Sequence, residues 1–135
     1  MIHEEVCTYE VCKLAKEKGF NGSGCFKHYD QNGLLRSNRS FSRFDLTIAE
    51  LYNHDTPSEV QVYAPTQSLL QRWLREEKGY YVYPFFDNGS KRWTWVCREL
   101  TGDMWIQLLD FEERYFDAYE LALEDALKYA LENLI

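Results

Sequence analysis

Residues 80–97 read YYVYPFFDNGSKRWTWVC, and the fold that the sequence predicts is built outward from this stretch. The Asn88-Gly89 dipeptide is typical of a β-hairpin, because both central residues of a type I′ turn need a positive φ. Seven aromatic side chains fall within these eighteen residues, and aromatic residues favour β-strands. The expected strand register places Asp87 opposite Ser90, Phe85 opposite Arg92, Tyr83 opposite Thr94 and Val82 opposite Trp95.

Both faces of the expected hairpin carry aromatic side chains, so neither is plainly the face in contact with solvent. One face carries Tyr81, Tyr83 and Phe85 opposite Arg92, Thr94 and Val96. The other carries Tyr80, Val82 and Pro84 opposite Trp93, Trp95 and Cys97. Pro84 has no backbone N–H to donate to a neighbouring strand, which predicts that its strand lies at an edge of the sheet.

Two helices are predicted ahead of the hairpin. The first covers residues 9–18, with Thr8 as its N-cap and Gly19 in the left-handed conformation at its end. The second begins at the N-cap Thr66, directly after a proline, and ends at Gly79. Their apolar stripes comprise Val11, Leu14 and Ala15 in the first helix and Leu69, Leu70, Trp73 and Leu74 in the second.

A third helix is predicted at the end of the chain. Asp117 as N-cap and Glu120 at position N3 would form an acidic capping box, and Phe116 and Leu121 would form a hydrophobic staple. The expected core stripe is Tyr119, Ala122, Leu123, Ala126, Leu127, Ala130 and Leu134. The expected solvent face is Glu120, Glu124, Asp125, Lys128 and Glu132, with Glu124 and Lys128 as a favourable i, i+4 pair.

The predicted fold class is α+β. Residues 104–109 would add a third strand, so that residues 80–109 form a three-stranded antiparallel meander packed against the second and last helices. An N-terminal helix and a hairpin at Asn32-Gly33 would precede this core, together with a short strand over residues 60–63. We expect a single domain, made of an N-terminal portion (residues 1–63) and a helix–meander–helix core (residues 64–135).

The sequence also resembles itself at two places. LAKEKGF at residues 14–20 is similar to WLREEKGY at residues 73–80, and an Asn-Gly turn follows each of them. A duplicated helix–hairpin unit would explain this likeness, and so would independent use of common helix-stop and turn residues.

The composition, with 45% apolar and 27% charged residues, is that of a soluble globular protein. We expect a cytoplasmic protein, because the chain has neither a membrane-spanning apolar run nor a signal peptide, and its four cysteines are then free thiols. The formal net charge is −7, of which −6 lies in residues 110–135. Such an acidic segment repels nucleic-acid phosphates and is most simply a solvated helix face.

Three segments carry a resemblance: TYEVCKLAKEKGF (residues 8–20), APTQSLLQRWLREEKGY (residues 64–80) and YFDAYELALEDALKYALENLI (residues 115–135). They resemble a group of small uncharacterised proteins of anaerobic gut bacteria and their phages. The resemblance covers about 50 residues and misses residues 21–63. It implies a phage or prophage setting and attaches no activity, cofactor or catalytic residue.

Candidate catalytic and metal-binding residues are few. Cys7, Cys12, Cys25 and His28 have ligand types that suit zinc, but they lack a C-x-x-C knuckle and are equally explained as buried thiols and a surface histidine. The sequence contains no glycine-rich phosphate loop, no HExxH and no GxSxG motif. We therefore expect a protein without enzymatic activity and without a cofactor, and assign no catalytic, cofactor-binding or metal residue.

The leading hypothesis is a protein-interaction protein of a phage or mobile element that binds another protein or itself as a homodimer. This hypothesis follows from the many aromatic residues of the hairpin and from the lack of recognisable catalytic or metal-binding motifs in the sequence. The candidate interaction residues are Tyr81, Tyr83, Phe85, Arg92, Trp93 and Trp95 of the hairpin, with Arg36, Arg39 and Arg43 of a basic, serine-rich segment.

Two alternatives stay open. The chain could be an accessory protein that binds nucleic acid through residues 36–44 and the aromatic hairpin, with Lys91 and Arg92 completing a basic side. It could also mimic DNA through the carboxylates of the last helix, although Lys128 and Arg114 interrupt the acidic row.

Overall fold

The computed structural model describes residues 4–37, 62–100 and 114–135. Its elements, in chain order, are α1 (Tyr9–Glu17), β1 (Lys27–Tyr29), β2 (Leu35–Ser37), β3 (Val62–Tyr63), α3 (Gln67–Trp73), the π-helical turn η1 (Leu74–Lys78), β4 (Tyr80–Asp87), β5 (Arg92–Glu99) and α4 (Tyr119–Asn133).

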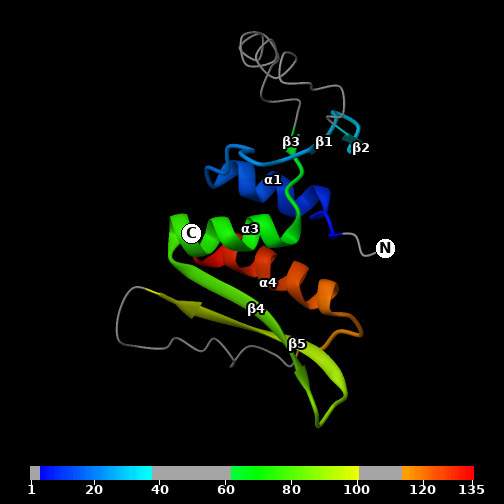
Figure 1. Ribbon diagram of the computed structural model, residues 1–135, viewed down its shortest axis with the longest axis vertical. Coiled ribbons are helices and arrows are strands. Elements are labelled where there is room, and N and C mark those ends of the chain that lie inside the picture. The colour runs from blue at the N-terminus through cyan, green and yellow to red at the C-terminus, as the bar shows by residue number, and fades with distance from the viewer. Residues whose placement is uncertain (1–3, 38–61, 101–113) are drawn as a thin grey trace.

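The elements form three layers, which Figure 1 shows from top to bottom. A small antiparallel sheet of order β2-β1-β3 lies at one end, the helices α1, α3 and α4 form the middle, and the antiparallel pair β4-β5 lies at the other end. Helix α4 contacts α1, α3, β4 and β5 and is the centre of the packing. The predicted α+β class is confirmed, whereas the predicted strand over residues 104–109 lies outside the described residues.

The expected register of the central hairpin is wrong by two residues. Asp87 pairs with Arg92, Tyr83 with Val96 and Val82 with Cys97. The connection is a four-residue loop, in which Asp87 accepts hydrogen bonds from the amides of Ser90 (3.0 Å, side chain) and Lys91 (2.8 Å, backbone). Positive φ falls on Lys91 (60°) and not on Asn88 or Gly89, so the turn is not type I′. A shift of two residues keeps each side chain on its predicted face.

In the part of the chain that the structure describes, Pro84 lies on an edge without a strand neighbour, as its missing N–H requires. Among the described strands β4 pairs only with β5. The carbonyl of Val82 accepts a hydrogen bond from Gln71 Nε2 (2.6 Å), so it points away from β5 towards helix α3. Pro84 follows two residues later and presents its backbone to the same side, where a strand neighbour would need an N–H.

Helices α1 and α3 begin side by side, each with the predicted threonine cap. Thr8 Oγ1 accepts from Val11 N (3.4 Å), and Thr66 Oγ1 accepts from Leu69 N (3.2 Å). An antiparallel bridge between Val6 and Thr66 joins the two helix starts. Each helix is followed by a glycine with positive φ, Gly19 (101°) and Gly79 (76°), and then by a hairpin. Duplication of a helix–hairpin unit therefore remains a hypothesis that the arrangement fits.

The predicted start of the last helix is wrong by one residue. Ala118 is the N-cap of α4, and no side chain caps it. Asp117 instead forms an ion pair with Arg92 (Oδ1 to Nε, 3.1 Å), and Phe116 bridges to Trp93 of β5 through two backbone hydrogen bonds. Leu121 is more than half exposed, so the predicted staple does not form. Contacts with β5 thus hold the start of α4 in place of a side-chain N-cap.

The core stripe of α4 is largely as predicted. The buried residues of the helix are Ala122, Leu123, Ala126, Leu127, Ala130 and Leu131. Leu131 was not expected there, and Tyr119, which was, is exposed instead. The small alanines let α1, α3 and the hairpin approach the helix from several sides.

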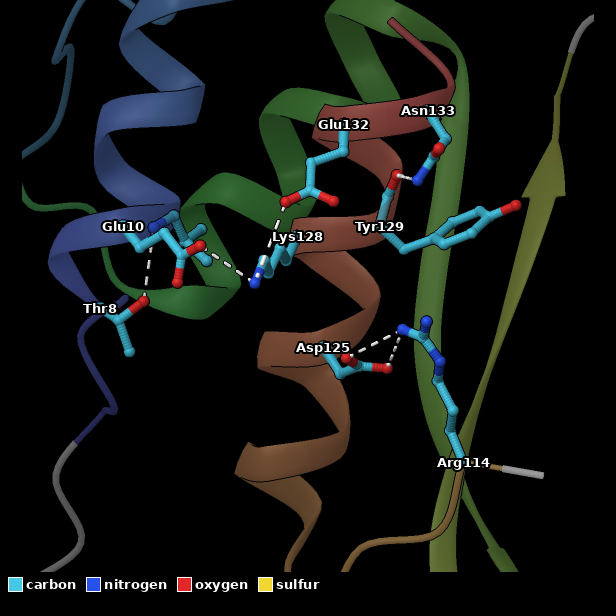
Figure 2. A network of polar contacts seen from close by, with 9 residues as sticks. Thr8, Glu10, Arg114, Asp125, Lys128, Tyr129, Glu132 and Asn133 are labelled. Atoms are coloured by element: carbon cyan, nitrogen blue, oxygen red, sulfur yellow. Dashed lines mark hydrogen bonds and ion pairs between the residues drawn. The ribbon is translucent and has the colours of Figure 1, made fainter. Parts of the chain in front are cut away.

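Glu124 does not form the predicted pair with Lys128. Its Oε1 accepts from the backbone N–H of Thr8 (2.7 Å), and its Oε2 accepts from Nε2 of the buried Gln67 (2.9 Å). Lys128 reaches Glu10 of α1 (3.0 Å) and Glu132 (3.9 Å). Figure 2 shows Lys128 between these two carboxylates. One glutamate of α4 therefore links the start of α1 to the start of α3.

We expect Glu124→Gln to lower the free energy of unfolding by about 1–2 kcal/mol, because one acceptor oxygen is replaced by a donor that faces Thr8 N or Gln67 Nε2. Chemical denaturation measures the change. Glu132→Gln on the same helix is the matched control and should stay within about 0.5 kcal/mol of wild type. Equal effects of the two substitutions would contradict the linking role of Glu124.

Candidate interaction surface

On the outer face of the hairpin, two neighbouring tyrosines lie between two arginines. The rings of Tyr81 and Tyr83 lie 4.8 Å apart between centroids. The guanidinium of Arg75, from η1, lies 5.5 Å from the Tyr81 centroid, and that of Arg98 lies 5.2 Å from the Tyr83 centroid. We call these four side chains the arginine–tyrosine ladder. All four side chains of the ladder are half-buried.

The inner face of the hairpin packs against α4. Trp95 is 7% exposed, and its Nε1 donates to Asp125 Oδ2 (2.8 Å). Asp125 also pairs with Arg114 through both carboxylate oxygens (3.1 Å each), as Figure 2 shows. The ring of Tyr129 lies 5.2 Å from that of Trp95. Of the proposed interaction residues, Trp95 therefore belongs to the core.

A second aromatic group lies at the turn end of the hairpin. Trp93 makes edge contacts with Phe86 and with Tyr119, with centroids 5.3 Å apart in each case. Phe86 is 42% exposed and Tyr119 39% exposed. The two backbone hydrogen bonds between Trp93 and Phe116 hold the start of α4 against β5 and fix the position of the third ring. We call Phe86, Trp93 and Tyr119 the ring cluster.

Burial raises the pKa of Tyr119 above its ordinary value, with nearby Tyr81 and Glu120 adding to the effect. The phenol of the ring cluster is therefore neutral at physiological pH and remains able to donate a hydrogen bond. The cluster combines apolar ring surface with two polar groups, the Tyr119 hydroxyl and the Trp93 indole N–H, which is a combination common at protein interfaces.

Arg36, one of the arginines that were expected to join the hairpin, does not form a basic face with it. Arg36 lies in β2 and pairs with Asp30 (2.8 Å), and this arginine holds the pKa of Asp30 below its usual value. Strand β2 and the β4-β5 pair lie at opposite ends of the molecule in Figure 1. Arg92 pairs with Asp117 in the hairpin layer. Arg39 and Arg43 lie outside the described residues.

The carboxylates of α4 are largely used within the molecule. Glu124 bonds Thr8 and Gln67, Asp125 holds Trp95 and Arg114, and Glu132 faces Lys128. A DNA mimic needs its charges displayed in rows on the surface. This arrangement gives no support to mimicry through α4, and we do not develop that alternative.

The cysteines considered for zinc lie in the core layer around α1. Cys7 and Cys12 are buried, and the Cys12 thiol donates to the Cys7 carbonyl (3.6 Å). Contact with the Cys12 thiol and burial raise the pKa of the Cys7 thiol far above its ordinary value, and burial raises that of Cys25 to about 12. Within residues 4–37, 62–100 and 114–135, no three histidine, cysteine or acidic side chains come together with a geometry that could hold a metal ion.

The comparisons with known protein families, with curated proteins and with solved structures find no match to this chain. None of the helices in the part of the chain that the structure describes has both the length and the apolar character needed to cross a membrane. The proposed function is therefore argued from the arginine–tyrosine ladder and the ring cluster.

Two members of the ring cluster were missed from the sequence. Side chains alternate between the two faces along β4, so Phe86 lies on the same face as Val82 and Pro84 and opposite Trp93. This alternation alone could have identified Phe86 from the sequence. Tyr119 was assigned to the core stripe because its spacing to Ala122 and Leu123 fits a helix. The bridge from Phe116 to Trp93 turns Tyr119 towards the hairpin, and no local pattern signals that bridge.

The thiols of the folded chain should be unreactive. We expect no fast labelling by a disulfide reagent such as DTNB at pH 8, because the thiolate is the reactive form and the raised pKa of Cys25 leaves little of it. Unfolding in guanidinium should release four thiols. Rapid stoichiometric labelling of the folded protein would contradict this prediction.

The raised pKa values of the buried thiols also make the free energy of unfolding depend on pH. Burial raises the pKa of Cys97 from 9.0 to about 11, so the unfolded chain loses this proton before the folded chain does. The free energy of unfolding should then fall as the pH rises from about 9 to about 11. Denaturation midpoints in that range measure the effect, and Cys97→Ser should reduce it.

Proposed function

We propose that the chain is a non-enzymatic interaction protein of a phage or other mobile element, and that the ring cluster binds its protein partner. The observation that supports this most is the exposure of Phe86 and Tyr119, each of which contacts Trp93. Large aromatic side chains that are neighbours and stay exposed are characteristic of protein interfaces.

The anchoring of the rings adds support. Trp93 is held by hydrogen bonds of its own backbone to Phe116, and Phe86 lies on the paired strand, so the rings are positioned before a partner arrives. A rigid aromatic surface loses little conformational entropy on binding. The partner would gain apolar contact without reorganising the core, because none of the three rings belongs to the buried core cluster.

The resemblance of residues 64–80 and 115–135 to small proteins of gut bacteria and their phages is what supports the mobile-element setting. These two segments include α3 and α4, whose buried residues form much of the core. The ring cluster draws one residue, Tyr119, from the second segment. The remainder of the cluster comes from the hairpin.

Affinity capture tests the proposal. Immobilised wild-type protein should retain a specific protein from a lysate of an anaerobic gut bacterium, and the double variant Phe86→Ser, Tyr119→Ser should lose it. Both positions are substantially exposed, so the fold should survive, which circular dichroism would verify. Leu34→Ser, an apolar position beside β2 that is more exposed than either ring, is the matched control and should retain the partner. Retention of the same proteins by all three would contradict a role for the ring cluster.

A second candidate function is binding of single-stranded nucleic acid. The arginine–tyrosine ladder is the specific observation in its favour, because arginine for phosphate and tyrosine for base stacking are the usual elements of such sites. The net charge of −7 and the separation of Arg36 from the hairpin count against it. Binding of single-stranded nucleic acid is therefore the second candidate, after binding of a protein partner.

A mobility-shift assay distinguishes the two. If the ladder binds nucleic acid, a single-stranded oligonucleotide should shift at low salt, the shift should fade as salt rises, and Arg75→Ala should weaken it at least about threefold. Arg72→Ala is the matched control, because Arg72 of α3 pairs with Glu76 of η1 and is not part of the ladder. The absence of a shift at low salt would exclude this function.

A further inference from the structure

Two buried cysteines meet at the start of helix α1. Cys7 and Cys12 are 0% and 1% exposed, and both belong to the buried core cluster. The Cys12 thiol donates a hydrogen bond to the carbonyl oxygen of Cys7 (3.6 Å). Contact with this thiol is also the main cause of the raised pKa of the Cys7 thiol. The two side chains are therefore neighbours, and we call them the cysteine pair.

The positions of the pair relative to the N-cap explain why the side chains meet. Thr8 is the N-cap of α1, so Cys7 is the N′ residue and Cys12 the N4 residue. Side chains at N′ and N4 pack against each other in a hydrophobic staple, which fixes the direction in which the chain enters a helix. In α1 both places of the staple hold a cysteine. Two thiols in contact, unlike two aliphatic side chains, can be joined by a covalent bond.

We propose that the cysteine pair is a redox site, at which a small-molecule disulfide such as glutathione disulfide oxidises Cys7 and Cys12 to an intramolecular disulfide. One cysteine thiolate attacks glutathione disulfide, forms a mixed disulfide with one glutathione and releases the other. The second cysteine then attacks the protein sulfur of the mixed disulfide and releases the remaining glutathione. Two protein thiols and one glutathione disulfide thus become one protein disulfide and two glutathione thiols.

Oxidation of the pair requires the chain ahead of α1 to open locally. The backbone N–H of Cys7 donates to the carbonyl of Pro65 (3.0 Å). The backbone N–H of Gln67 donates to the carbonyl of Glu5 (2.8 Å). These bonds hold the entering chain against the start of α3 and keep the thiols out of contact with solvent. The reaction should therefore be slow in the folded chain, which agrees with the unreactive thiols expected above.

The disulfide would tie the entering chain to the first turn of α1. The carbonyl of Cys7 also accepts from the hydroxyl of Tyr29 in β1 (2.7 Å), so Cys7 joins α1 both to the small sheet and to the start of α3. In the folded chain the two side chains are already in contact, whereas the unfolded chain must first close the loop between them. At equilibrium the folded chain should therefore be oxidised more readily than the unfolded chain.

Peptide mapping tests the proposal, because one tryptic peptide carries both members of the pair. Cleavage after Lys13 leaves Cys7 and Cys12 in the same peptide, and Cys25 lies in the peptide that ends at Lys27. The folded full chain is equilibrated with glutathione redox buffers and quenched with acid, and its free thiols are alkylated before digestion. The first peptide should then be lighter by two hydrogen atoms and unalkylated at both cysteines. The equilibrium constant for this bond should be at least about tenfold larger in the folded chain than in concentrated guanidinium.

Two variants control the experiment. In Cys12→Ser the hydroxyl can still donate to the Cys7 carbonyl, so the fold should persist, which circular dichroism would verify, and the intramolecular bond should be absent. Cys25→Ser changes a half-buried thiol outside the pair and should form the bond as readily as wild type.

Four results would overturn the proposal. They are persistence of both thiols after equilibration with glutathione disulfide, mixed disulfides with glutathione as the only products, a bond that joins the two tryptic peptides through Cys25, and an equilibrium constant no larger in the folded chain than in guanidinium.

Discussion

The carboxylate of Glu124 is the interaction on which the arrangement of the helices depends. It projects from the middle of α4 and accepts hydrogen bonds from Thr8, the cap of α1, and from Gln67, the first residue of α3. In a capping box the glutamate that bonds the N-cap amide belongs to the same helix. Here α4 supplies the glutamate, so the start of α1 combines its own Thr8 side-chain cap with a hydrogen bond to another helix. The three-helix layer therefore joins locally capped helices through tertiary contacts.

Tertiary contacts at the start of α4 also produce the interaction surface. Helix α4 begins without a side-chain cap, and the residues ahead of it are held by β5 instead, through the Phe116–Trp93 bridge and the Arg92–Asp117 ion pair. That attachment rotates Tyr119 away from the core and onto Trp93. A local cap at Asp117 would have left the ring cluster incomplete. The surface that we propose for binding is thus a consequence of how α4 is joined to the sheet.

The aromatic side chains on the two faces of the hairpin have different roles. Its inner face supplies Trp95 to the core, where a tryptophan N–H needs a partner and finds Asp125. Its outer face carries the arginine–tyrosine ladder, in which the cations already have ring partners within the chain. Only at the turn end do large rings combine exposure with fixed positions. This difference in exposure, and not the number of aromatic residues, is why the ring cluster is the preferred binding surface.

The sequence by itself determined the local features. The threonine caps at Thr8 and Thr66, the glycine that ends each of those helices and the face of each hairpin residue follow from backbone sterics and side-chain periodicity within a few residues. Only the tertiary structure decided the hairpin register, the partner of Glu124 and the cap of α4. A two-residue loop over Asn88-Gly89 and a four-residue loop over residues 88–91 are both compatible with the sequence, and the folded hairpin has the second. Likewise, Glu124 fits an i, i+4 pair locally, but Gln67 is buried and needs an acceptor, and that need exists only once the helices have met.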